Sequence, residues 1–234
     1  MPAWGGRCPT ASSGRAARTR AMTERFPARA LRGLYAVTPD DPDTGRLLAL
    51  AYSVLAGGPA LLQYRNKGAD AGLRREQALA LRDACRAAGV PFIVNDDLAL
   101  ALAIDADGAH LGREDGPPAA ARAALGPQRI LGLTCYADWS RATEGAAVGA
   151  DYIAFGAMFP SITKPHAPPA PFALIGRAKR ELGLPVAAIG GITLERAPQV
   201  LAAGADLLAV VGNVFGAADP AARARAYGTL FRAP

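Results

Sequence analysis

The chain has 234 residues, of which 51% are hydrophobic and only 6% are aromatic. This length is enough for one sizeable domain or two, and α/β barrels commonly use it as one, while the composition suits a core of Ala, Leu and Val rather than a disordered chain. The net charge of +6 is concentrated at the N-terminus, because residues 1–23 hold four arginines and no acid, which leaves +2 for the rest of the chain. So balanced a remainder gives little support for nucleic-acid binding.

The cysteines give no sign of a disulfide framework or a zinc site. Cys8, Cys85 and Cys135 form no CxxC motif and cannot all pair. This usage favours a reducing compartment. No apolar run approaches the roughly 18 residues that a membrane span needs. We therefore expect a cytoplasmic protein without a membrane partner.

The segment before Leu31 is rich in Arg, Ala, Ser and Gly and lacks the hydrophobic region of a secretory signal. It resembles a transit peptide only in composition. A disordered tail, or an upstream start codon with Met22 as the true initiator, explains it more simply. We predict a disordered basic extension at residues 1–28 and one catalytic domain at residues 29–234.

From Leu31 onward, short apolar runs alternate with helical patterns in eight cycles. The predicted strands lie at 34–39, 60–65, 91–96, 107–112, 129–135, 151–156, 185–191 and 206–212. The predicted helices lie at 44–56, 73–88, 98–103, 118–125, 139–148, 172–182, 194–203 and 220–231. Continuous apolar strands separated by helices indicate a parallel sheet covered by helices. Eight such units predict a TIM (β/α)8 barrel rather than an open doubly wound sheet.

A Gly-Ala-Asp phrase recurs before two strands, at 149–151 and 204–206, with Asp105-Ala106-Asp107 as a looser copy. A glycine at the end of a helix supplies the left-handed turn that leads into the next strand. These positions fall at the amino ends of the strands, so we interpret them as structural.

The carboxyl ends of the predicted strands carry cations, neutral donors, carboxylates and glycines. They are Gln63, Arg65, Lys67, Asn95, Asp96, Asp115, Thr134, Ser161, Thr163, Lys164, Gly190, Gly191 and Gly212. In a barrel these residues converge on one mouth, where such enzymes place their active sites. The set suits a polyphosphate and its metal.

Asp96 and Asp115 follow strands that are neighbours in the predicted barrel. Parallel neighbours lie about 4.8 Å apart, so both carboxylates emerge on the same rim. One or two carboxylates, with phosphate oxygens and water, form a typical Mg²⁺ site. The alternative is that Asp96 or Asp97 caps the following helix and Asp115 caps the next one.

Lysine usage and paired glycines add to the phosphate hypothesis. The chain has 23 arginines and three lysines, and two of the lysines, Lys67 and Lys164, lie at strand ends. A compact ammonium suits a point-charge contact to a phosphate oxygen. Gly190-Gly191 and Val211-Gly212 supply backbone amides before helices, which bind phosphate unless these glycines serve only tight turns.

Seven motifs in order resemble those of thiamine phosphate synthases. They are LQYRNK, NDD, HLGREDGP, LGLT, FGAMFPSITKP, IGGI and LAVVG, and the similarity runs from about Leu34 to Phe215. The resemblance implies an Mg²⁺-dependent transferase that joins a pyrimidine methyl diphosphate to a thiazole phosphate. It is also compatible with a homo-oligomer.

The resemblance also implies roles for individual residues. Asp96 and Asp115 would bind magnesium, while Arg65, Lys67 and Lys164 would stabilise the departing diphosphate. Thr163 and the Gly191 amide would face the thiazole phosphate, and Ser161, Val211 and Gly212 would also bind substrate. Gln63, Asn95 and Thr134, together with those three cations, would contact the pyrimidine diphosphate.

Three positions depart from the family's usual residues. Gly212 replaces a common serine and removes a hydroxyl, so the thiazole phosphate would depend more on backbone amides. Thr134 and Ser161 exchange Ser and Thr and keep a hydroxyl. His110 and His166 are expected to be a packed strand residue and an exposed loop residue, and Cys135 is expected to pack.

The implied reaction needs no general base. Departure of the diphosphate would leave a carbocation that the aminopyrimidine ring stabilises, and the thiazole nitrogen would capture it. One alternative is a thiazole tautomerase with the same barrel, against which the retained diphosphate residues count. Another is a non-catalytic phosphate-binding barrel.

Overall fold

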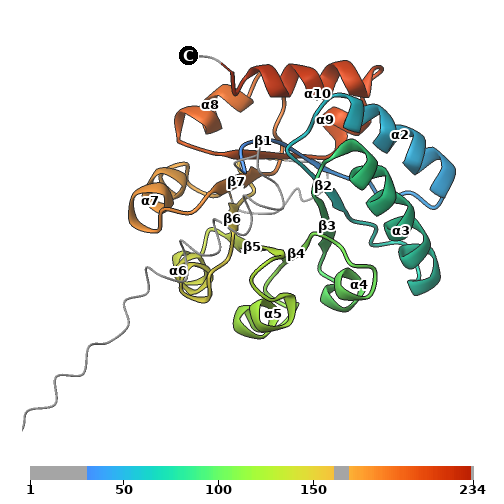
Figure 1. Cartoon of the computed structure of the whole chain (residues 1–234). Coiled ribbons are helices and arrows are strands. Elements are labelled where there is room, and N and C mark those ends of the chain that lie inside the picture. Colours follow the sequence, from blue (N-terminus) through green and yellow to red (C-terminus); the bar gives the residue numbers. More distant parts are fainter. Residues whose placement is uncertain (1–30, 161–168, 233–234) are drawn as a thin grey trace, which may run out of the picture.

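In the computed structural model, which describes residues 31–160 and 169–232, eight parallel strands pair in chain order and the last pairs with the first (Figure 1). The strands are β1 (Gly33–Val37), β2 (Leu61–Tyr64), β3 (Phe92–Asn95), β4 (Gly108–Leu111), β5 (Ile130–Tyr136), β6 (Tyr152–Phe155), β7 (Val186–Ile189) and β8 (Leu207–Val210). The predicted TIM barrel is confirmed.

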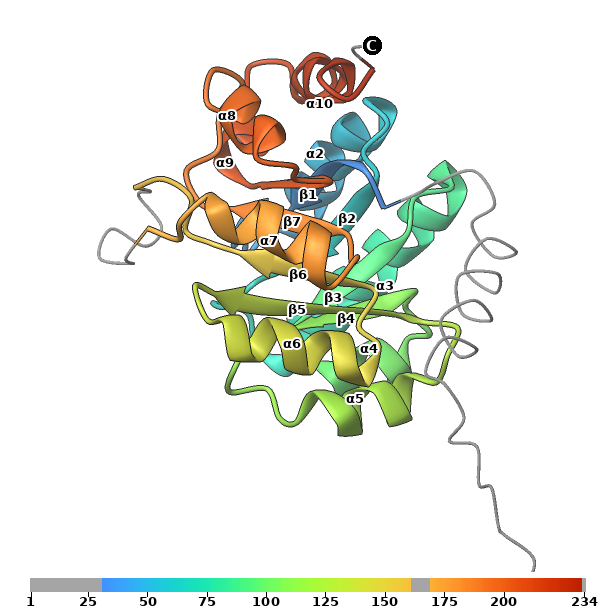
Figure 2. The same cartoon turned by 90° about the vertical axis from the view of Figure 1, so that its left-hand side faces the viewer.

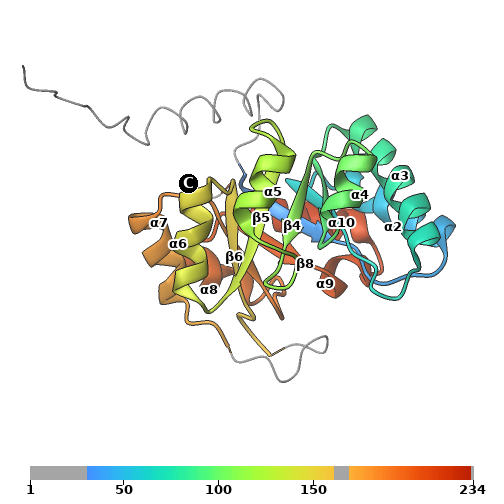
Figure 3. The ribbon, with the colours of Figure 1, turned by 90° about the horizontal axis from the view of Figure 1, so that it is seen from below.

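The helices surround the barrel, as the views from the side and from below show (Figure 2 and Figure 3). They are α2 (Thr44–Ala56), α3 (Ala71–Ala88), α4 (Leu98–Ala103), α5 (Pro118–Leu125), α6 (Trp139–Val148), α7 (Ala173–Glu181), α8 (Ala197–Ala202), α9 (Gly212–Phe215) and α10 (Pro220–Thr229). The last of these, α10, packs against α2 and β1, so the ring of helices closes where the barrel closes (Figure 1).

Aspartate caps fix where several helices begin. The side chains of Asp43, Asp70, Asp97, Asp138 and Asp219 each accept a hydrogen bond from a backbone amide in the first turn of the next helix. Each such cap stabilises the fold by about 1 kcal/mol. The cap at Asp70 explains why α3 begins two residues before the predicted Leu73. Without a side-chain cap, α8 begins at Ala197, three residues after the predicted Leu194.

The aspartates at the amino ends of the strands are structural, as the Gly-Ala-Asp phrases predicted. Asp151 accepts from the amide of Leu131 at 2.8 Å, and Asp206 accepts from the amide of Val186 at 2.9 Å. Each carboxylate therefore replaces a missing ladder bond at the start of the neighbouring strand. Gly149 has φ 78°, which confirms the left-handed turn before its strand.

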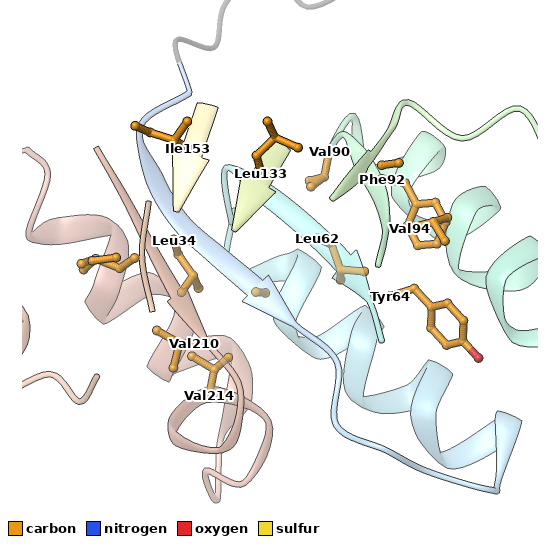
Figure 4. Close-up of a cluster of buried hydrophobic side chains, with 14 of the residues drawn as sticks. Leu34, Leu62, Tyr64, Val90, Phe92, Val94, Leu133, Ile153, Val210 and Val214 are labelled. Carbon is orange, nitrogen blue, oxygen red and sulfur yellow. The ribbon is translucent and has the colours of Figure 1, made fainter. Parts of the chain in front are cut away.

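The core has two layers because strand residues alternate between the faces of the barrel. On β1, Tyr35 and Val37 join the interior cluster, whereas Leu34 and Ala36 join the cluster under the helices. Figure 4 shows part of this outer layer around Leu34 and Leu62. The interior also carries buried polar side chains, among them Gln63 and His110.

The described helices include none that is long and apolar enough to cross a membrane. Cys85 and Cys135 are buried free thiols, and the predicted packing of Cys135 is confirmed. Burial raises the pKa of Cys135 to about 12, so it remains a thiol at neutral pH. Cys8, Met22 and the predicted extension at residues 1–28 lie outside the described residues.

Candidate active site

The described members of the predicted site lie at the carboxyl ends of the strands. Gln63 and Thr134 belong to β2 and β5, and Asn95 ends β3. The loops after the strands carry Arg65, Lys67, Asp96, Asp115, Gly190, Gly191 and Val211, and Gly212 is the first residue of α9. Ser161, Thr163, Lys164 and His166 lie outside the described residues. A parallel barrel places all of these loops on one rim, where TIM-barrel enzymes hold their active sites.

Asp96 is held in a left-handed conformation directly after β3. Its φ is 62°, and its amide donates to the carbonyl of His110 at 2.8 Å, so it continues the ladder to β4. Asp97, not Asp96, caps α4, by accepting from the amide of Leu100 at 2.8 Å. A non-glycine residue at positive φ costs about 1–3 kcal/mol and is typical of functional sites. The capping alternative thus applies to Asp97 and leaves the Asp96 carboxylate at the mouth.

Asp115 closes the loop after β4 and does not cap the next helix. Its Oδ2 accepts from the amide of Gly112 at 2.6 Å, whereas α5 begins at Pro118 and its N-cap residue, Pro117, makes no side-chain cap. Burial, the largest influence, raises the pKa of Asp115; the Gly112 amide opposes this, and the charge and hydrogen bond of Asp96 raise it further. The Asp96 carboxyl therefore lies near enough to that of Asp115 to raise its pKa.

A single carboxylate, Asp40, organises the two cations that follow β2. Its Oδ1 accepts from the Arg65 guanidinium and from the Lys67 amide, each at 2.9 Å. Lys67 Nζ in turn lies 3.5 Å from Asp96 Oδ2. The cations and the acidic pair thus form one connected group. The sequence reasoning missed Asp40, and its only signal was an acidic pair directly after the first strand.

A pocket of about 240 Å³ opens beside this group, between the loops after β2 and β3. Its lining includes Lys67, Asn95 and Asp96, together with Arg74 from the first turn of α3. The Arg74 Nε is buried and has no hydrogen-bond partner among the described residues. Arg74 was not predicted as a site residue, because it reads as one of several arginines on a helix.

The glycines after β7 and β8 differ in the space around them. Gly191 has φ 62°, and a Cβ atom there would lie 2.6 Å from the carbonyl oxygen of Pro160. This position therefore requires glycine. Gly212 is not at positive φ, and a Cβ atom there would meet nothing within 4 Å.

Gln63 and Thr134 are the two ends of an interior hydrogen-bond chain that runs through Tyr35, Tyr152 and His110. Gln63 is only 3% exposed, and its Nε2 donates to the Tyr35 hydroxyl at 2.6 Å. The Tyr35 and Tyr152 hydroxyls lie 2.6 Å apart. His110 Nδ1 lies 2.9 Å from the Tyr152 hydroxyl, and its Nε2 lies 2.6 Å from Thr134 Oγ1. His110 is thus packed and hydrogen-bonded, as predicted.

Burial fixes the protonation states within this chain. It lowers the pKa of His110 to about 4, with the charge of Asp96 opposing the shift, so the imidazole is neutral at pH 7. It also raises the pKa values of Tyr35 and Tyr152 well above 10, so both hydroxyls remain protonated. No side chain of the interior hydrogen-bond chain is therefore charged at neutral pH.

Arg141, which the sequence reasoning also missed, ties the loops after β4 and β5 together. This buried side chain donates through Nε to the carbonyl of Thr134 at 2.7 Å and through a terminal nitrogen to the carbonyl of Gly112 at 2.5 Å. Gly112 also holds Asp115, so the guanidinium supports the acidic pair indirectly. Nothing in its local sequence marks it, because it lies inside a predicted helix.

The closed barrel and its acidic and cationic mouth define a TIM-barrel enzyme. The chain belongs to the thiamine monophosphate synthase family, whose model matches residues 34–214. It is accordingly a transferase of thiamine biosynthesis.

Individual relatives agree with this assignment. The chain is 64% identical over 208 residues to the thiamine-phosphate synthase of Aromatoleum aromaticum. The matched region covers 89% of this chain and all of the relative. It is 60% identical over 201 residues to that of an Azoarcus species, covering 86% of this chain and 98% of the relative. A solved thiamine phosphate pyrophosphorylase from Pyrococcus furiosus superposes with a TM-score of 0.76 at 30% identity, covering 89% of this chain and 98% of that structure.

Proposed function

We propose that the chain forms thiamine phosphate by a dissociative route, with Asp96 and Asp115 as magnesium ligands and the cations beside them as the diphosphate site. The substrates would be 4-amino-2-methyl-5-hydroxymethylpyrimidine diphosphate and 4-methyl-5-(2-phosphoethyl)thiazole or its carboxylated tautomer. The observation that carries the proposal is the placement of Lys67 Nζ 3.5 Å from Asp96 Oδ2, beside a second acid, Asp115, whose pKa the Asp96 carboxyl raises.

The residues present fit a magnesium ion. Two neighbouring carboxylates repel each other when both are ionised, and a shared divalent cation removes that repulsion. Only oxygen ligands are offered by this pair, which matches the preference of magnesium, and phosphate oxygens and water would complete the shell. When bound, the ion would supply positive charge to the diphosphate oxygens.

The protein's own part is to stabilise charge on the leaving group. The bond between the pyrimidine methylene carbon and the ester oxygen breaks, and the electron pair leaves with the diphosphate. Lys67 and Arg65 would bind the oxygens on which this charge develops, and Asp40 holds both residues in place beforehand. Preorganised cations of this kind are a large term in catalysis. Lys164 is proposed as a third cation on the family resemblance alone.

Capture of the carbocation requires the thiazole nitrogen to lie close to the methylene carbon. The thiazole phosphate is proposed to bind the loops after β7 and β8, through Gly191, Val211 and Gly212, together with Ser161 and Thr163. Anchoring both substrates by their phosphate ends aligns the reacting atoms, which lowers the barrier by removing orientational freedom before reaction.

The direct test is turnover with both substrates. Purified protein, the pyrimidine diphosphate, the thiazole phosphate and Mg²⁺ should yield thiamine phosphate and diphosphate in equal amounts. Omitting either substrate, or chelating the metal, should abolish the product. Conversion of the carboxylated thiazole to its tautomer without any joining would instead support a thiazole tautomerase. Binding without conversion would support a non-catalytic barrel.

A further inference from the structure

We propose that Tyr35, Tyr152 and His110 are positioning residues for recognition of the aminopyrimidine ring. Through the interior hydrogen-bond chain they determine which atoms Gln63 and Thr134 present at the mouth. The inference rests on the proposed function, which assigns both end residues to the pyrimidine substrate.

The interior hydrogen-bond chain is continuous and joins side chains from five strands. Gln63 on β2, Tyr35 on β1, Tyr152 on β6, His110 on β4 and Thr134 on β5 are joined by four contacts of 2.6 to 2.9 Å. Local packing of any one strand does not require this arrangement. The chain links two proposed substrate contacts through the centre of the barrel.

Counting protons gives the interior hydrogen-bond chain a direction of donation, from Gln63 to Thr134. The Gln63 amide nitrogen can only donate, so the Tyr35 oxygen accepts from it. With Tyr35 donating onward to Tyr152, the Tyr152 proton goes to His110 Nδ1. The neutral imidazole then carries its proton on Nε2 and donates to Thr134. In this direction every contact has one donor and one acceptor.

The two ends of the chain are therefore coupled. In this direction Gln63 presents its carbonyl oxygen and a second N–H, while the Thr134 hydroxyl keeps its own proton to donate. In the reverse direction the Tyr35 proton would point at Gln63, whose amide would have to turn over to accept it. The Thr134 hydroxyl would then donate its proton to His110 Nε2 and could not donate to a ligand. A change at either end requires a change at the other.

The first direction matches an aminopyrimidine. Such a ring presents an exocyclic amine, a donor, beside a ring nitrogen, an acceptor. A side-chain amide satisfies both at once, its oxygen accepting and its N–H donating, as glutamine does with adenine. The remaining amide proton of Gln63 is the one that reaches Tyr35. A ring without the amine would leave the carbonyl oxygen of Gln63 without its partner.

Aromatic packing keeps the chain rigid. The rings of Tyr35 and Tyr152 meet edge to face at a centroid distance of 5.6 Å, and His110 stacks on Tyr152 at 5.5 Å with an interplanar angle of 16°. All three side chains are buried. Polar groups fixed in this way before a ligand binds lose little conformational freedom on binding.

The test uses Tyr152→Phe, which removes one hydroxyl from the middle of the chain and keeps the ring. Its matched control is Tyr64→Phe. Tyr64 is also a buried strand tyrosine, but its hydroxyl donates to Gln77 on the outer side of the barrel, at 2.9 Å. Both variants lose one buried hydroxyl with one or more partners, so a general packing effect would appear in both.

The probes are two unreactive pyrimidine ligands, in which a CH2 group replaces the ester oxygen of the diphosphate so that the diphosphate cannot leave. One carries the 4-amino group and the other carries hydrogen there. We expect Tyr152→Phe to weaken binding of the amino ligand about 10-fold and that of its partner much less. The KM for the thiazole phosphate should not change. Tyr64→Phe should leave the preference for the amino ligand as in the unaltered protein.

A cycle with Gln63→Ala shows whether Tyr152 acts through the amide. In the Gln63→Ala background, Tyr152→Phe should cost little further affinity for the amino ligand. Equal losses for both ligands in Tyr152→Phe, or a preference like that of Tyr64→Phe, would overturn the inference. Tyr35→Phe repeats the test should Tyr152→Phe fail to fold. If the unaltered protein does not bind the amino ligand at all, the proposed function fails along with it.

Discussion

Asp96 and Asp115 are neighbouring acids at the mouth of the barrel, although they follow different strands, and the Asp96 carboxyl raises the pKa of Asp115. Neither is a helix cap: Asp97 caps α4, and Asp115 is held by the amide of Gly112. The left-handed backbone of Asp96 and the closed loop of Asp115 thus hold two acids together. The charge of Lys67 offsets part of the repulsion between the two acids, and the proposed magnesium ion would offset more of it.

Asp115→Asn should therefore stabilise the metal-free protein. The asparagine oxygen can still accept from Gly112, and the repulsion from Asp96 is removed. The folded state raises the pKa of Asp115 above its ordinary 3.8, so ionisation of this acid lowers the free energy of unfolding. This loss of stability grows as the pH rises above 3.8 and is complete at neutral pH. We expect Tm without metal to rise by about 2–4 °C at pH 7 if about 1 kcal/mol is recovered, and the gain to shrink as the pH falls towards 3.8.

The same melting curves with Mg²⁺ provide the control. A ligand that binds the folded state raises Tm, so the unaltered protein should gain stability with metal and the variant should gain much less. A metal-free Tm for Asp115→Asn below that of the unaltered protein at pH 7 would contradict the proposed repulsion.

Gly212→Ser should be tolerated and should tighten binding of the thiazole phosphate. Gly212 is not at positive φ, and a Cβ atom there meets nothing within 4 Å, so the backbone can accept a side chain. A hydrogen bond from the added hydroxyl to a charged group is worth about 1.5–3 kcal/mol at best. The measurement is the KM for the thiazole phosphate. Gly212→Ala is the control, and a serine that performs no better than alanine would show that the hydroxyl does not reach the phosphate.

Deleting residues 1–28 should leave folding and turnover intact. The family match begins only at residue 34, and the first barrel strand begins at Gly33. Tm and kcat of the truncated and full-length proteins are compared directly. A loss of activity or a large fall in Tm on truncation would assign those residues a role that their composition does not suggest.

Much of the fold could be predicted because its causes are local. An aspartate before an apolar helical pattern marks a helix start, as at Asp43 and Asp138, and these caps are present. Alternating strands and helices then leave few arrangements for eight parallel strands. Asp96 and Asp115 could be paired in advance because neighbouring parallel strands end on one rim.

The parts of the site that escaped prediction depend on contacts between distant segments. Asp40 matters because it binds Arg65, 25 residues away, and Tyr35 matters because its hydroxyl meets that of Tyr152, 117 residues away. Arg141 binds the carbonyl of Gly112, 29 residues away. Helical or strand periodicity carries no information about such pairs, so only the folded barrel reveals them.

The magnesium proposal can be separated from a purely structural role by kinetics. Asp96→Asn and Asp115→Asn keep the shape of each side chain and remove its charge, and asparagine tolerates the left-handed backbone at position 96. Each variant should lower turnover by about 100-fold or more and shift the metal requirement to higher concentration. The double variant should be much less than multiplicatively worse, because residues that act as one unit are not additive.

Asp97→Asn is the matched control: it removes a neighbouring charge, but asparagine also caps a helix well, so the Mg²⁺ dependence should not move. Titrating Mg²⁺ against turnover in all four variants decides the matter, and unaltered metal curves for both Asp96→Asn and Asp115→Asn would rule out a shared magnesium ion.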